Sequence, residues 1–126
     1  MASRCASAPK APLAASVLFL VFNRPEHTSR VFEAIRQVQP ERLYVAADGP
    51  RPHLPEEAKK CEDVRKIVAG IDWPCEVKTL LRSENLGCKE AVSSAITWFF
   101  DHEPEGIILE DDCLPSPAFF WFCQEL

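Results

Sequence analysis

The stretch SVLFLVFNRPEHTSRVFEAIRQVQP, residues 16–40, decides the fold class of this chain. From Val17 to Phe22 it is continuously apolar, and polar residues and a proline end the run, as is typical of a strand buried on both faces. The second part predicts an amphipathic helix, because its apolar residues recur at helical spacing until Pro40 stops the pattern. These apolar residues are Val31, Phe32, Ile35 and Val38.

The same alternation of strand and helix continues along the chain. Amphipathic stretches separate three further apolar stretches, each of which ends in polar residues. We therefore expect an α/β fold, with a mostly parallel, Rossmann-like sheet that carries helices on both faces. The further predicted strands lie within residues 42–50, 75–87 and 105–112, and the further helices within residues 55–71 and 88–103.

The composition is typical of one globular domain, with 126 residues, of which 47% are hydrophobic and 26% charged. The net charge of −5 gives no electrostatic basis for binding nucleic acid or an anionic membrane surface. The longest apolar run, residues 17–22, is too short to span a bilayer. Six cysteines without a Cys-x-x-Cys pair predict reduced, mostly buried thiols rather than a zinc site, and hence a cytoplasmic protein.

The two ends of the chain differ from the middle. Residues 1–16 are rich in Ala, Ser and Pro and are predicted to form a flexible leader before a domain at 17–126. The last segment, SPAFFWFCQEL (116–126), predicts a helix after Pro117 with four adjacent aromatic residues, too many for one helical turn to bury. Either this helix docks on the sheet, or the chain is the front part of a longer domain; exposed aromatic residues would favour self-association.

Polar residues follow every predicted strand. In open α/β sheets, ligands bind outside the carboxyl ends of the strands, so these residues are expected to gather into a site that combines cations and anions. Lys89 follows Gly87 at a predicted helix start, where backbone amides suit a phosphate group. The alternative is that these are ordinary solvated turns, since strand ends are polar in most proteins. The strand-end residues are Asn23, Arg24, Asp48, Arg82, Asn85, Glu110, Asp111 and Asp112.

The acidic triplet after the last strand is the most informative of these features. In an extended segment Glu110 and Asp112 point to one face and Asp111 points to the other. Adjacent carboxylates repel one another, and an open set of oxygen ligands suits a hard cation such as Mg²⁺ or Mn²⁺ that completes its shell with phosphate oxygens. The triplet therefore predicts a metal site, with a solvated strand end as the alternative.

Four segments together resemble the GT-A glycosyltransferases, a fold family of nucleotide-diphospho-sugar transferases. IILEDDCLPSPAFFWF (107–122) is similar to their Asp-x-Asp-type segment, and especially to the Glu-Asp-Asp version of certain N-acetylglucosaminyltransferases. VLFLVFNRP (17–25) resembles their first strand, and VAADGP (45–50) lies where they carry an aspartate that contacts the base. RSENLG (82–87) resembles the Arg-x-x-Asn-x-Gly loop of many sugar transferases, and the resemblance covers roughly residues 17–126.

The resemblance implies a role for each polar residue at the strand ends. Asp112 would bind Mn²⁺ or Mg²⁺ directly, with Glu110 and Asp111 nearby on the ribose, the sugar or metal-bound water; we assign Glu110 to the metal. Asp48 would contact the base, and Arg24 the phosphate or the ribose. The implied nucleotide-binding residues are Asn23, Arg24, Asp48, Arg82, Lys89 and Asp111.

The implied function is transfer of a sugar from a nucleotide diphosphate, with a UDP-sugar favoured, to a hydroxyl acceptor. In the resembled family the acceptor site and the catalytic base belong to a second half, so residues 17–126 correspond to an N-terminal, donor-binding half, and we identify no catalytic residue in them. The alternative is a non-catalytic nucleotide-binding or interaction module. A receiver domain and a P-loop hydrolase do not fit, because the acidic and glycine motifs that they require are missing from the expected positions.

Overall fold

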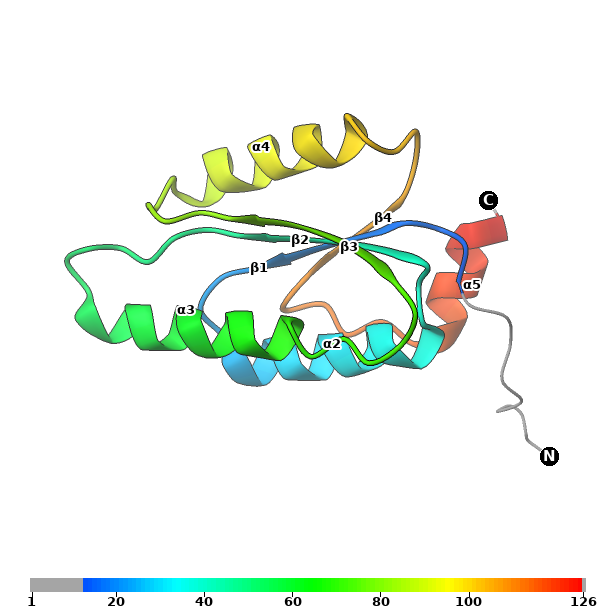
Figure 1. Ribbon diagram of the computed structural model, residues 1–126, viewed down its shortest axis with the longest axis horizontal. Coiled ribbons are helices and arrows are strands. Elements are labelled where there is room, and N and C mark those ends of the chain that lie inside the picture. The colour runs from blue at the N-terminus through cyan, green and yellow to red at the C-terminus, as the bar shows by residue number, and fades with distance from the viewer. Residues whose placement is uncertain (1–12, 126) are drawn as a thin grey trace.

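The computed structural model describes residues 13–125 of the chain, and these residues form four strands and four helices in strict alternation (Figure 1). This order confirms the α/β fold predicted from the sequence, and the sheet is parallel throughout. The elements are β1 (Val17–Val21), α2 (Pro25–Val38), β2 (Arg42–Ala47), α3 (Pro55–Val68), β3 (Glu76–Leu81), α4 (Cys88–Phe100), β4 (Ile107–Glu110) and α5 (Pro117–Glu125).

The strand order is β3-β2-β1-β4, so the first strand lies in the interior of the sheet. The chain builds outward from β1 through β2 to β3, and then returns through α4 to add β4 on the other side of β1. In the register between these two strands, Leu20 of β1 lies opposite Glu110 of β4. The order of the strands therefore reverses between β1 and β4, and in doubly wound sheets such a switch point is the usual place for a ligand.

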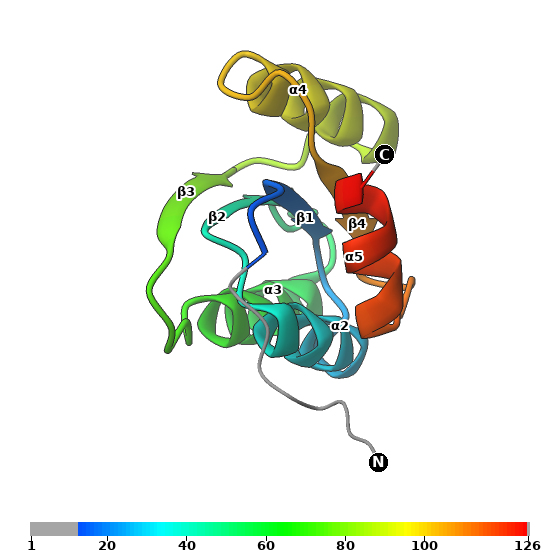
Figure 2. The same ribbon diagram turned by 90° about the vertical axis from the view of Figure 1, so that its right-hand side faces the viewer.

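The helices cover both faces of the sheet, as Figure 2 shows in end view. Alternation along β1 sends Phe19 toward α2 and α3 in one buried cluster, while Leu18 and Leu20 pack in a second cluster with Ala95 and Phe99 of α4. This two-sided burial explains why β1 reads as a continuous apolar run rather than an alternating one. In contrast, β3 is an edge strand whose residues are exposed or half-buried.

The packed part of the chain begins before β1. Residues 1–12 of the predicted leader lie outside the described residues, but Leu13 is fully buried. The Leu13 N–H donates to the carbonyl of Val38 at 3.1 Å, and its carbonyl accepts from the Glu41 N–H at 3.0 Å. The packed part of the described chain therefore includes residues before β1, since Leu13 and Ser16 are both buried.

The C-terminal helix α5 packs beside β4 and contacts α2 (Figure 2). Of its aromatic residues, Phe120 is fully buried in the core, whereas Phe119 and Phe122 are 40% and 64% exposed. The Gln124 side-chain oxygen accepts hydrogen bonds from the Ala14 and Ala15 N–H groups, which ties the helix to the segment before β1. The helix thus docks on the domain through one aromatic face and leaves another face exposed.

No helix within residues 13–125 is long and apolar enough to cross a membrane. The five described cysteines form no disulfide with one another, and the prediction that most of the thiols are buried is wrong for these five. Only Cys61 of the five is buried, while Cys88 and Cys113 are exposed.

Candidate functional site

A cleft of about 410 Å³ opens at the carboxyl edge of the sheet, the left-hand end in Figure 1. It extends across the switch point between β1 and β4 and reaches the loops after β2 and β3. Every predicted site residue except Lys89 lies in its wall, and Lys89 is instead exposed on the first turn of α4. The predicted residues in the wall are Asn23, Arg24, Asp48, Arg82, Glu110, Asp111 and Asp112.

Small side chains make room for the cleft between α4 and the sheet. Ala46 on β2 faces Ala91 and Ala95 on α4, so that no large side chain fills the space near the strand ends. Leu20 and Leu80 add to this apolar floor, and the charged residues lie around the rim. An apolar cavity with a few convergent polar groups is the usual form of a small-molecule site, and the volume is within the common range of roughly 300–1,000 Å³.

The acidic triplet forms the β4 side of the rim. Burial raises the pKa of Asp111, the nearby Arg24 guanidinium and, less strongly, the His27 side chain oppose that rise, and the carboxylates of Asp112 and Glu110 add to it. Arg24 ends the loop after β1, so the parallel pairing of β1 with β4 is what brings it to the triplet. The positive charge beside the acids therefore comes from Arg24, and the exposed His27 lies near the same carboxylate.

The triplet also determines what kind of metal site this rim could form. Within residues 13–125, no three His, Cys, Asp or Glu side chains are gathered so as to hold a metal ion by themselves. Mg²⁺ and Mn²⁺ are often held by only one or two carboxylates, with the remaining positions filled by water and substrate phosphates. Glu110 and Asp112, both exposed at the end of β4 and both in the cleft wall, fit a site of that open kind.

Asp48 anchors the loop that follows β3. Its buried Oδ1 accepts from the N–H groups of Gly49 at 2.9 Å and Leu86 at 2.8 Å. Its Oδ2 accepts from the side-chain amide of Asn85 and from the N–H of Gly87, both at 3.1 Å. A carboxylate has about four acceptor positions, and all of these are taken. Contact between Asp48 and a base, the role predicted for it, would have to replace one of these bonds.

Two further features hold this loop against the end of β2. A Cβ atom added to Gly49 would lie 2.6 Å from main-chain atoms of Glu84, so only glycine allows the two backbones to approach this closely. From α3, the Arg65 guanidinium donates to the Asp48 carbonyl at 3.3 Å and to the Arg82 carbonyl at 2.6 Å. The loop after β3 is therefore fixed to the end of β2 by the Asp48 carboxylate, by the close backbone approach at Gly49 and by the Arg65 guanidinium.

Helix N-termini contribute positive potential to the same edge. Within the described residues, no side chain caps α2 or α4, whose first turns adjoin Arg24 and Gly87. Gly87 has φ +89°, a left-handed conformation that lets the chain turn from the loop into α4, and the space beside its Cα is open. Uncapped N–H groups at two helix starts favour an anion in the cleft.

Sequence reasoning missed one cationic residue in the cleft wall. Arg51, in the loop between β2 and α3, lines the cleft and binds the buried carboxylate of Glu57. The motif VAADGP ends at Pro50, and Arg51 is the next residue of the same strand-end loop.

No protein-family model matches this chain, and no curated protein matches its sequence. The assignment of a function therefore depends on the cleft and on the sequence motifs alone.

Proposed function

We propose that the cleft binds a nucleotide-diphosphate sugar together with Mn²⁺ or Mg²⁺, and that the protein is a glycosyltransferase-like protein of the GT-A type. The observation that carries the proposal is the meeting of Arg24 after β1 with the carboxylates of Glu110 and Asp112 after β4 in one cleft at the switch point. The Arg24 guanidinium can bind the negative diphosphate, and the carboxylates of Glu110 and Asp112 can bind the divalent cation that accompanies it.

In this proposal each part of the ligand is bound by a different group of residues. The apolar floor and the loop anchored by Asp48 accommodate the nucleoside, with Asn85 and Asn23 as polar neighbours. Arg24 and Arg82 donate to phosphate oxygens, and Arg82 is steadied by donating to the Ser94 hydroxyl at 3.2 Å. Asp112 and Glu110 would hold the cation, and Asp111 lies beside Arg24 near the ribose or the sugar. Lys89 lies outside the cleft wall, on the first turn of α4, so in this proposal it contributes less to nucleotide binding than the residues in the wall.

The corresponding reaction is sugar transfer. The bond from the anomeric carbon to the diphosphate oxygen breaks, and the diphosphate leaves with the electron pair. The acceptor hydroxyl oxygen forms the new bond to the anomeric carbon and gives its proton to a base. A divalent cation supplies charge stabilisation of the departing diphosphate when it is bound. We assign no base among the described residues, so a nucleotide-binding module without turnover is the alternative proposal.

A UDP-sugar is the favoured ligand, and a cytoplasmic location accords with the free cysteines.

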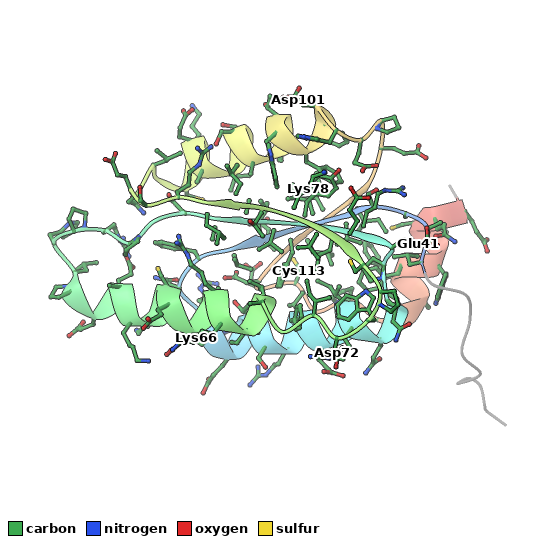
Figure 3. All side chains as sticks on the ribbon, in the orientation of Figure 1. Glu41, Lys66, Asp72, Lys78, Asp101 and Cys113 are labelled. Carbon is green, nitrogen blue, oxygen red and sulfur yellow. The ribbon has the colours of Figure 1, made fainter. Side chains whose placement is uncertain are left out.

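Calorimetric titration tests the proposal. UDP and then GDP are titrated into the chain with and without Mn²⁺, and the titrations are repeated with Asp112→Asn and with Asp101→Asn as a matched surface control. Figure 3 labels Asp101 at the end of α4 that lies away from the cleft. We expect binding that needs Mn²⁺ and is lost in Asp112→Asn but retained in Asp101→Asn. If the folded wild-type chain binds neither nucleotide, the proposal fails; binding without release of free sugar from a UDP-sugar would favour the non-catalytic module.

A further inference from the structure

Glu57 is a buried carboxylate directly behind the cleft wall. It lies in the first turn of α3, and its side chain is only 5% exposed. Buried carboxylates are rare unless they are paired and fully hydrogen-bonded. Glu57 meets this requirement with partners from two different strand-end loops, and both partners line the cleft.

Arg51 supplies most of these hydrogen bonds. Its Nε donates to Glu57 Oε1 at 2.9 Å and its Nη2 to Oε2 at 2.6 Å, while its backbone N–H donates to Oε1 at 2.9 Å. The other partner is Asn23, whose side-chain amide donates to Oε2 at 2.7 Å. One carboxylate thus fixes the loop after β1 and the loop after β2 relative to each other.

The pairing uses only one edge of the Arg51 guanidinium. Arginine carries five N–H donors in a planar fork, and the edge formed by Nε and Nη2 is occupied by Glu57. Within residues 13–125, Nη1 and the second hydrogen of Nη2 make no hydrogen bond. The side chain is 44% exposed and belongs to the cleft wall, and its guanidinium carbon lies 5.8 Å from the centre of the Phe22 ring. The second edge is therefore held in place and accessible to a ligand.

We propose that Arg51 binds the phosphate groups of the cleft's ligand through this second edge, and that Glu57 is the positioning residue that holds the guanidinium ready. The inference deepens the proposed function and rests on it. An arginine that is already fixed loses little side-chain entropy on binding, and its planar edge matches two oxygens of one phosphate.

The alternative is that Arg51 only satisfies Glu57 and stabilises the loop. The two roles differ in which ligands they affect: loss of a phosphate contact weakens UDP but not uridine, whereas a loosened loop weakens both. They also differ from a general effect of charge, for which the chain offers a matched control. Arg36 pairs with Glu33 and Asp72 and has its guanidinium carbon 5.3 Å from the centre of the Phe32 ring, yet it lies outside the cleft wall.

The test is NMR titration of UDP and of uridine, each with Mg²⁺, into wild type, Arg51→Ala, Arg51→Lys, Glu57→Gln and Arg36→Ala. This method measures weak binding and reports in the same spectra whether each variant is folded. For Arg51→Ala we expect UDP affinity to fall about tenfold or more, as for loss of a charged hydrogen bond, with uridine affinity nearly unchanged. Arg51→Lys keeps the charge without the fork and should lose part of the UDP affinity, and Arg36→Ala should lose none. Glu57→Gln should weaken UDP several-fold through a misplaced Arg51.

Unchanged UDP affinity in folded Arg51→Ala would overturn the inference, as would an equal loss of UDP and uridine affinity. If Arg51→Ala does not fold, unchanged UDP affinity in Arg51→Lys has the same meaning. Failure of wild type to bind UDP is a distinct result, because it overturns the proposed function itself and the inference with it.

Discussion

Replacement of Asp48 by asparagine tests whether this residue anchors the cleft. The Oδ1 atom of asparagine can still accept from Gly49 and Leu86, but an NH₂ group then replaces Oδ2. That group would be a donor facing two donors, the Asn85 side-chain amide and the Gly87 N–H. Both donors are part-buried, and the Asn85 amide keeps its hydrogen bond to the Gly49 carbonyl at 2.8 Å. A donor left without an acceptor costs about 1–3 kcal/mol, so we expect Asp48→Asn to lower the free energy of unfolding by about that amount.

The assay is urea unfolding followed by circular dichroism, with the same slope expected for both proteins because the fold is unchanged. The matched control is Asp63→Asn, which removes an exposed pair with Lys59 and should cost no more than about 0.5 kcal/mol. If Asp48→Asn unfolds at the wild-type urea concentration, the anchoring role is refuted. The carboxylate would then be available for the base contact that the sequence resemblance implies.

Three further predictions follow from the same contacts. Gly49→Ala should destabilise the fold by about 1–3 kcal/mol, because its Cβ would overlap the Glu84 backbone; a stability equal to wild type would contradict the observed approach. The hydrogen bond from Arg51 lowers the pKa of Glu57 to about 2, so its stabilisation is present above about pH 4.5 and is lost as the pH falls toward 2. Acid unfolding should show a loss on the order of 2 kcal/mol that Glu57→Gln lacks, after allowance for screening by solvent around the exposed guanidinium. Burial, followed by its hydrogen bond to Glu103, raises the pKa of Tyr44 to about 12. Absorbance titration of this single tyrosine should therefore give a midpoint near 12 in the folded chain and near 10 in urea, with stability lost as the pH rises through this range; a midpoint near 10 when folded would contradict the burial.

The order of strands and helices was predictable because a strand buried on both faces needs apolar residues at every position, and this pattern is visible in the sequence. The interior strand β1 is apolar at every position, whereas the edge strand β3 mixes Glu76 and Lys78 with its apolar residues. The order of the strands within the sheet was not predictable in this way, because the local sequence of β4 does not indicate that it pairs with β1. That pairing is what brings Arg24 and His27 to Asp111.

The site could be predicted as a set of residues but not as a network. Residues at the carboxyl ends of parallel strands must share one edge, and that rule alone gathers most of them. Which carboxylate is already satisfied depends on bonds across long separations, such as that from Leu86 to Asp48, and on backbone shapes that sequence patterns do not encode. Likewise, four adjacent aromatic residues give no sign that Phe120 turns into the core while Phe122 faces solvent.

The central claim is that a diphosphate nucleotide and a divalent cation bind at the carboxyl edge, and an amide chemical-shift map tests it most directly. UDP with Mg²⁺ is added to the ¹⁵N-labelled chain, and the shifted N–H groups are assigned. The account predicts that the largest shifts lie at Arg24, in the loop from Asn85 to Cys88, and at Asp111 and Asp112, and that they require Mg²⁺. Shifts confined to other parts of the chain, or a spectrum of the folded protein that UDP and Mg²⁺ leave unchanged, would contradict it.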